Sequence, residues 1–242
     1  MSRLKLLIVL LLASVLALNA LTALAQTDSD TSTALVLDID GPLTPSLAEY
    51  LERGLTEAQE QGAALVILRL NTPGGAIDLM SRMVEDIRLS PVPVVVYVAP
   101  RGALAGSAGT VITLAGHFSA MAPETAIGAA SPIDASGADI NETLEAKTKE
   151  ILKAQIRSLT EGRLPPEAVA LAEDTVENAA AVSAGEALEI GLIGYIANDI
   201  PALLRQLDGQ TADTIDGPVI VETAYLQVEE FSLTFIEELL NM

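Results

Sequence analysis

The chain has 242 residues, of which half are hydrophobic and 3% are aromatic, and it contains neither Trp nor Cys. Acidic residues outnumber basic ones 33 to 13, which argues against a nucleic-acid partner because phosphate binding requires clustered Lys and Arg. The lack of Cys excludes disulfides and cysteine-ligated metals, and the single histidine, His117, excludes any site built on two imidazoles.

Residues 1–25 have the three parts of a secretory signal peptide. Two basic residues precede an uncharged run over residues 6–18, and the segment ends in small residues at Ala25. Cleavage there predicts an exported, extracytoplasmic chain with a polar, disordered lead over residues 26–33. The alternative is an uncleaved N-terminal anchor, because the whole apolar stretch is just long enough to span a bilayer. Either interpretation places the rest of the chain outside the cytoplasm.

After this lead, short apolar strands alternate with amphipathic helices. The predicted strands lie at residues 34–39, 64–70, 93–98, 118–121, 192–197 and 218–222. The predicted helices lie at residues 45–61, 77–89, 107–114 and 142–161, followed by a helical pair up to Gly191 and a final C-terminal helix. Residues 127–139 are rich in small residues and are predicted to form a loop. The alternation indicates an α/β fold with a mostly parallel sheet covered on both faces.

Two glycine-rich loops follow neighbouring predicted strands. In residues 71–75 (NTPGG), Gly74 and Gly75 allow backbone N–H groups to approach a ligand closely, which is the geometry that an oxyanion hole needs. In residues 100–110, Ser107 opens a helix, whose N-terminus stabilises developing negative charge. Each loop alone is equally consistent with an ordinary turn and an N-cap serine. Together, at one edge of a parallel sheet, they predict a nucleophilic serine site.

A nucleophilic serine needs a base, and the only histidine is poorly placed to supply it. His117 follows Ser107 by ten positions, and the intervening helix would separate the two by about 15 Å. This distance argues against a Ser-His-Asp triad, and His117 is expected to be structural.

The three lysines that follow the leader all lie on the predicted helix 142–161. A projection at about 100° per residue puts Lys147 beside Leu144 and Ile151 at the apolar edge, whereas the other two lysines fall on the polar side. Loss of water at that edge would favour the neutral amine that a general base requires. The alternative is a lysine that snorkels from the rim of an apolar face.

Four segments resemble the protease domain of the NfeD family, whose members are membrane-bound serine proteases partnered with stomatin-like proteins. The segments are residues 71–75, 106–110, 121–129 and the helix that carries Lys147. The resemblance covers about residues 34–207 and implies a fold of the Clp protease/crotonase type. Residues 208–242 are then expected to be a C-terminal strand–helix extension that leads towards a membrane region absent from this chain.

The resemblance also implies the roles of individual residues. Ser107 would be the nucleophile and Lys147 the general base, with oxyanion-hole N–H groups from Gly74, Gly75 and Ala108. The implied activity is that of a Ser-Lys endopeptidase that needs no metal or cofactor and cleaves apolar segments of a stomatin-like membrane protein. Folds of this type usually self-associate, so a homodimer or larger assembly is expected.

Two positions depart from the patterns of related proteins. Clp proteases have a histidine where this chain has Ala130, which agrees with lysine as the base. The NfeD family commonly has Asn three residues after the lysine, whereas this chain has Glu150. A carboxylate one helical turn from Lys147 could hold that lysine in its charged form through an ion pair.

Two other functions remain open at this point. A crotonase-type enzyme would use the same paired N–H groups to stabilise a thioester enolate, but coenzyme A is not expected outside the cytoplasm. A catalytically weak or inactive module could instead assemble with a stomatin-like membrane protein, and Glu150 is the residue that motivates this alternative.

Overall fold

The computed structural model describes residues 32–132 and 141–241. The predicted signal peptide, all but the end of the predicted lead, and residues 133–139 of the predicted loop lie outside the described residues. Residues 32–242 form one compact unit.

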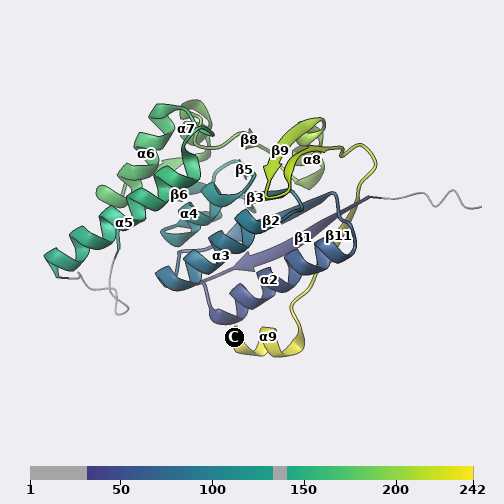
Figure 1. Cartoon of the computed structure of the whole chain (residues 1–242), viewed down its shortest axis with the longest axis horizontal. Coiled ribbons are helices and arrows are strands. Elements are labelled where there is room, and N and C mark those ends of the chain that lie inside the picture. Colours follow the sequence, from purple (N-terminus) through teal and green to yellow (C-terminus); the bar gives the residue numbers. More distant parts are fainter. Residues whose placement is uncertain (1–31, 133–140, 242) are drawn as a thin grey trace, which may run out of the picture. The chain divides into compact units, whose positions relative to one another are not determined.

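A six-stranded sheet forms the centre of this unit (Figure 1). Its strands, in spatial order, are β11 (Gln227–Phe231), β1 (Thr33–Asp40), β2 (Leu65–Asn71), β3 (Val94–Val98), β5 (Phe118–Met121) and β8 (Tyr195–Ile196). Every neighbouring pair is parallel. All five residues of β3 are buried, as expected for a central strand covered on both faces. The predicted α/β class with a mostly parallel sheet is confirmed.

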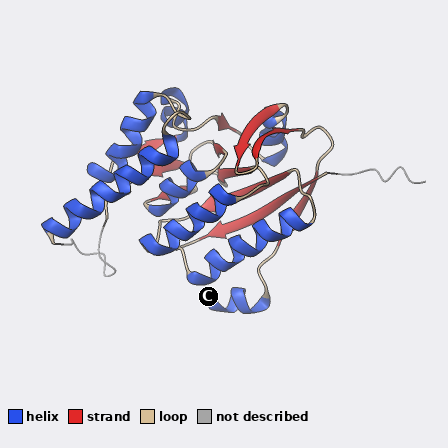
Figure 2. Cartoon of the chain, in the orientation of Figure 1, coloured by secondary structure: helices blue, strands red, loops and turns tan. Residues whose placement is uncertain are grey.

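Helices cover both faces of the sheet (Figure 2). Leu35, Leu37 and Ile39 of β1 point to one face and belong to a core shared with α2 (Pro45–Glu60), α3 (Ile77–Leu89) and α4 (Ala108–Ala115). Beyond α4 lie α5 (Glu142–Thr160), α6 (Pro166–Glu177) and α7 (Ala184–Ile190). Ala34 and Val36 point to the other face, where α8 (Ile200–Leu207) and the antiparallel pair β9 (Gln210–Thr214) and β10 (Gly217–Val221) complete a second core.

A second, three-stranded sheet lies next to the first and corrects the start of the predicted loop, because residues 127 and 128 belong to a strand. It is formed by β4 (Leu104–Gly106), β6 (Ala126–Gly128) and β7 (Ala181–Ser183). Gly128 illustrates why small residues occur here, because a Cβ atom at this position would lie 2.3 Å from the carbonyl oxygen of Ala180. Strands of three residues show too little alternation to be recognised in a sequence.

Two arginines cap the carboxyl end of α4. Every residue of α4 is buried, so its last carbonyl groups cannot reach water. Arg163 donates hydrogen bonds to the carbonyl oxygens of Leu114 and Gly116, and Arg88 donates one to Ala115. Burial, with the nearby charge of Arg88, lowers the pKa of Arg163 to about 10. Charged side chains therefore fix the far end of the helix that begins after Ser107.

His117 follows this capped end and has a structural role, as predicted. Its Nδ1 accepts a hydrogen bond of 3.0 Å from the backbone N–H of Val94, at the start of β3. Its Nε2 is buried and has no hydrogen-bond partner among the described residues. Burial, together with the positive charges of Arg88 and Arg163, lowers the pKa of His117 from 6.5 to about 4. The imidazole is therefore neutral at pH 7.

This depressed pKa predicts a loss of stability in acid. Below about pH 6.5 the unfolded chain takes up a proton that the folded His117 does not, and the difference grows until about pH 4. The effect on the free energy of unfolding is at most about 3 kcal/mol. His117→Asn keeps an acceptor for Val94 but does not titrate, so urea denaturation between pH 7 and 4 should show a shallower decline than in the wild type. Parallel declines would contradict this prediction.

Candidate active site

The loop after β2 continues alongside β4 and brings the first glycine-rich segment to the serine. The backbone N–H of Thr72 donates to the carbonyl of Leu104 at 2.7 Å, and Gly106 N–H donates to the Thr72 carbonyl at 2.9 Å. The side-chain oxygen of Asn71 accepts from Leu104 N–H at 3.0 Å. These bonds extend the pairing beyond the end of β2 and hold the glycine turn beside Ser107.

Ser107 occupies a strained turn between a strand and a helix. It lies between β4 and α4 with φ 52° and ψ −117°, a conformation that residues other than glycine rarely adopt. Its N–H donates to the carbonyl of Gly128 at 2.9 Å. The hydroxyl of Thr110 donates to the carbonyl of Ala105 at 2.9 Å and accepts from Gly128 N–H at 3.0 Å. A strained strand–serine–helix turn is the arrangement that exposes a nucleophilic serine in other hydrolases.

The glycine turn approaches Ser107 so closely that side chains are excluded. A Cβ atom at Gly74 would lie 2.7 Å from the Cβ and 3.1 Å from the Oγ of Ser107, and Gly74 has φ +117°. A Cβ atom at Gly75 would lie 2.6 Å from the Cβ of Leu43. The two glycines are therefore required by the packing of this turn between the loop that follows β1 and the serine.

Ser107, Gly75 and Ala108 line a pocket of about 60 Å³. The other lining residues are all apolar: Ile77, Met80, Val111, Ala130, Pro132 and Leu152. Ala130 is thus in the pocket wall. An apolar wall with a single hydroxyl suits the side chain of an apolar residue next to the reacting group.

Two of the three expected oxyanion-hole amides are available to a ligand. Among the described residues, the N–H groups of Gly75 and Ala108 have no hydrogen-bond partner. Ala108 is the first residue of α4, where the helix dipole adds positive potential. The N–H of Gly74 instead donates to the hydroxyl of Thr72 at 3.0 Å. Gly74 therefore provides space and shape, and Gly75 and Ala108 provide the free donors.

Two positioning residues were not identified from the sequence. Thr72 fixes the glycine turn and Thr110 fixes the serine turn, each through a buried hydroxyl. The available signal was a hydroxyl residue inside each glycine-rich loop, where a small side chain can bond to the neighbouring backbone.

Lys147 lies on α5 but is exposed, contrary to the expected desolvation. Its neighbours Leu144 and Ile151 are also exposed, by 55% and 66%. The buried side of α5 is formed by Leu152, Ile156 and Thr160. Leu152, which lines the pocket, is about 140° around the helix from Lys147. Within a single chain, Lys147 is on the helix that forms the pocket wall without being part of the lining.

The ion pair between Lys147 and Glu150, which would have supported an inactive module, is not formed. Glu150 pairs instead with Lys153 at 2.6 Å, and Lys149 pairs with Glu145 at 2.7 Å. Within residues 32–132 and 141–241, Lys147 makes neither an ion pair nor a hydrogen bond. The departure from the family pattern at position 150 therefore does not tie up the candidate base.

Comparisons with known proteins show the family of the chain. A family profile described as the N-terminal domain of NfeD1b matches residues 33–216. The chain belongs to the NfeD1b family. Membrane-bound protease PH1510 of Pyrococcus horikoshii is 36% identical over 202 residues, which cover 79% of this chain and 45% of that protein. This NfeD1b-family chain thus spans about half the length of the curated relatives it matches. None of the helices described for it has the length and apolar character to cross a bilayer.

Solved structures support the predicted Clp-type fold. One similar structure is the 1510-N membrane-bound stomatin-specific protease from Pyrococcus horikoshii, solved as a lysine-to-alanine variant in complex with a substrate peptide. It has a TM-score of 0.78 and 30% sequence identity to the NfeD1b-family chain. The match covers 87% of the NfeD1b-family chain and 97% of the solved chain. A serine-to-alanine variant of the same protease has a TM-score of 0.76 and 31% identity, with coverages of 84% and 99%. ClpP1 from Listeria monocytogenes has a TM-score of 0.56 and 19% identity over 69% of this chain and 94% of its own, a likeness of fold alone.

The close approach at Gly74 predicts a sharp difference between two glycine variants. Gly74 and Gly41 have similar positive φ angles, +117° and +105°, but a Cβ atom at Gly41 would contact nothing within 4 Å. Gly74→Ala should therefore lower the free energy of unfolding by about 1–3 kcal/mol more than Gly41→Ala, because only the former forces overlap with Ser107. Urea denaturation of both variants measures this difference, and equal losses would show that backbone strain alone is responsible.

Proposed function

We propose that this NfeD1b-family chain is a serine endopeptidase with Ser107 as nucleophile and Lys147 as general base. The observation that carries the proposal is the convergence of Ser107 with two unpaired backbone N–H groups, of Gly75 and Ala108, at one apolar pocket. The relatives add support, because PH1510 is named a protease and its solved variants replace a serine and a lysine.

The proposed reaction is acyl transfer in two steps. Neutral Lys147 takes the proton from Ser107 Oγ as this oxygen forms a bond to the peptide carbonyl carbon. The resulting oxyanion accepts hydrogen bonds from the N–H groups of Gly75 and Ala108. Collapse of the intermediate breaks the C–N bond, and the leaving amine takes the proton from Lys147. Water then adds to the acyl-enzyme by the reverse proton movements and releases the acid. These steps use protein groups and water alone.

The proposed substrate is an apolar segment of a polypeptide. The small pocket beside Ser107 is lined by aliphatic side chains and would take an aliphatic side chain of the substrate. The related 1510-N protease is described as stomatin-specific, and this description supports a stomatin-like membrane protein as the target of the NfeD1b-family chain as well. We propose an extracytoplasmic, membrane-associated location, which the membrane-bound relative supports.

A covering surface is needed to remove water from Lys147. The stripe formed by Leu144, Lys147 and Ile151 is exposed in the single chain. We propose that a second copy of the chain covers this stripe in a homodimer or larger assembly, because burial next to aliphatic side chains favours the neutral amine. The exposed lysine also motivates the second candidate function, a catalytically weak module that assembles with a stomatin-like protein.

Substitutions at the dyad should separate a base from a structural lysine. Ser107→Ala and Lys147→Ala should each reduce peptide cleavage by at least about 10³-fold. Lys147→Arg should be equally inactive, because a guanidinium stays protonated. Lys149→Arg, on the same helix and able to keep its ion pair with Glu145, is the matched control and should cleave normally. Apolar peptide libraries with products identified by mass spectrometry provide the measurement. An active Lys147→Arg would refute the assignment of the base, and an inert wild type would favour the non-catalytic module.

The rate of cleavage should increase with pH. Only the neutral amine of Lys147 can accept the proton from Ser107, so kcat/KM should rise with pH between about pH 6 and 9. The measurement is a pH profile with one peptide, with folding checked at each pH by circular dichroism. A flat profile over this range would argue against lysine as the base.

A further inference from the structure

The orientation of the peptide between Gly74 and Gly75 decides whether the pocket has two free N–H donors or one. This peptide is trans, so its C=O and its N–H point in opposite directions. The N–H of Gly75 has no partner among the described residues and lies at the pocket, and the carbonyl of Gly74 points away from it. A flip of this one peptide would aim a carbonyl oxygen at the pocket in place of a donor.

The two glycines themselves offer little resistance to such a flip. Glycine adopts positive and negative φ angles about equally well, since it has no Cβ atom, and Gly74 already has φ +117°. Larger side chains, which would restrict the rotation, are excluded here by the contacts with Ser107 and Leu43. The orientation of the peptide must therefore be held by groups outside the turn.

Leu43 supplies such a group from the loop between β1 and α2 (residues 41–44, the β1–α2 loop). Its backbone N–H donates to the carbonyl oxygen of Gly74 at 2.9 Å. The hydroxyl of Thr72 lies farther from the same oxygen, at 3.4 Å. Leu43 also packs against Gly75, where a Cβ atom would lie 2.6 Å from the Cβ of Leu43. One residue therefore holds the outward carbonyl and contacts the glycine that follows it.

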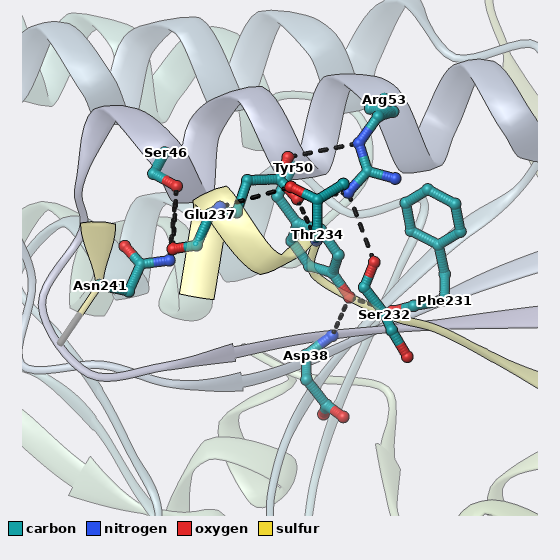
Figure 3. A network of polar contacts seen from close by, with 9 residues as sticks. All are labelled: Asp38, Ser46, Tyr50, Arg53, Phe231, Ser232, Thr234, Glu237 and Asn241. Carbon is teal, nitrogen blue, oxygen red and sulfur yellow. Dashed lines mark hydrogen bonds and ion pairs between the residues drawn. The ribbon is translucent and has the colours of Figure 1, made fainter. Parts of the chain in front are cut away.

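The β1–α2 loop is a firm support because it is anchored at both ends. The N–H of Gly41 donates to the carbonyl of Asn71 at 2.8 Å, and Thr44 is the N-cap of α2. Farther along α2, the buried Tyr50 accepts a hydrogen bond of 3.0 Å from the N–H of Asp38 in β1 (Figure 3). Loop and helix are thus tied to the sheet that carries the glycine turn.

We propose that Leu43 is a positioning residue that keeps the N–H of Gly75 directed at the pocket. The inference rests on the proposed peptidase function, in which this N–H and that of Ala108 stabilise the oxyanion. Leu43 acts through the glycine turn and takes no part in the proton transfers. Because the oxyanion forms only during the reaction, the hydrogen bond from Leu43 should affect kcat more than KM.

Replacing the backbone amide of Leu43 by an ester tests the hydrogen bond alone. Leucic acid, the α-hydroxy analogue of leucine, is introduced into the whole protein by stop-codon suppression and exchanges the N–H for oxygen without changing the side chain. Leucic acid at position 192 is the matched control, because Leu192 is buried, donates its N–H to the carbonyl of Ala187 at 2.8 Å and does not line the pocket.

The two esters should differ in the kinetics of peptide cleavage. The ester at position 43 should lower kcat by about 10- to 10³-fold and change KM by less than about threefold, because one oxyanion donor is weakened. The ester at position 192 should leave both constants within about threefold of the wild type. A loss confined to KM, or an equal fall in kcat in both esters, would overturn the proposal.

A second variant separates the hydrogen bond from the packing of Leu43. Leu43→Ala keeps the N–H but removes most of a buried side chain. It should lower the midpoint of urea denaturation more than the ester at position 43 does, yet reduce kcat less. If the loss of kcat instead followed the loss of stability in these two variants, Leu43 would have a structural role only.

The orientation of the peptide is also measurable without cleavage. In NMR spectra of protein with isotope-labelled glycine, the amide signal of Gly75 reports the hydrogen bond to the carbonyl that precedes it. This signal should move in the ester at position 43 and stay in place in the ester at position 192, and an unchanged signal in both would refute the role of Leu43. A wild type that cleaves no peptide would refute the proposed peptidase, and the Gly75 signal would still decide whether Leu43 holds the peptide.

Discussion

A close approach in the candidate active site, between the backbone of Gly74 and the side chain of Ser107, constrains the surrounding structure. No residue with a Cβ atom fits at Gly74, so the turn after β2 must be glycine. The glycine turn stays in contact with the serine because the N–H and the carbonyl of Thr72 both form hydrogen bonds with β4. The strain at Ser107 is in turn held by Gly128 and by the hydroxyl of Thr110. The short strands of the second sheet thus hold the glycine turn and the serine turn in contact.

The same constraint explains the unusual burial of α4. A helix that starts at the serine and enters the core keeps its first N–H groups directed at the pocket, but it also buries its last carbonyls. Arg163 and Arg88 satisfy these carbonyls from outside the helix. Burial at this cap lowers the pKa values of Arg163 and of the adjacent His117. A polar cap far from the pocket is therefore part of what keeps the serine in place.

The sequence predicted the parts of the fold that have a strong pattern. The bounds of the apolar strands β2 and β3 and of the amphipathic helix α3 were predicted almost to the residue. The sequence also predicted that the glycine turn and the serine turn lie together. The strands β4, β6 and β7 were missed because three residues are too few to show a period, and α8 and β11 were missed in a weakly patterned segment. The packing side of α5 was mispredicted, because Leu152 and Ile156 form an apolar stripe that competes with the one beside Lys147.

This last error identifies where the chemistry is incomplete in one chain. The electrostatic half of the candidate site, Ser107 with the amides of Gly75 and Ala108, is assembled by strands and a buried helix and needs no rearrangement. The base half is on an exposed helix face surrounded by exposed aliphatic residues. Burial beside aliphatic residues favours a neutral amine, so we expect the two proposed halves to act together only when another surface covers α5. In the proposed peptidase, the nucleophile would then be preorganised within one chain, and the base would depend on assembly or on the substrate. Such a dependence would restrict cleavage to encounters that bury the helix.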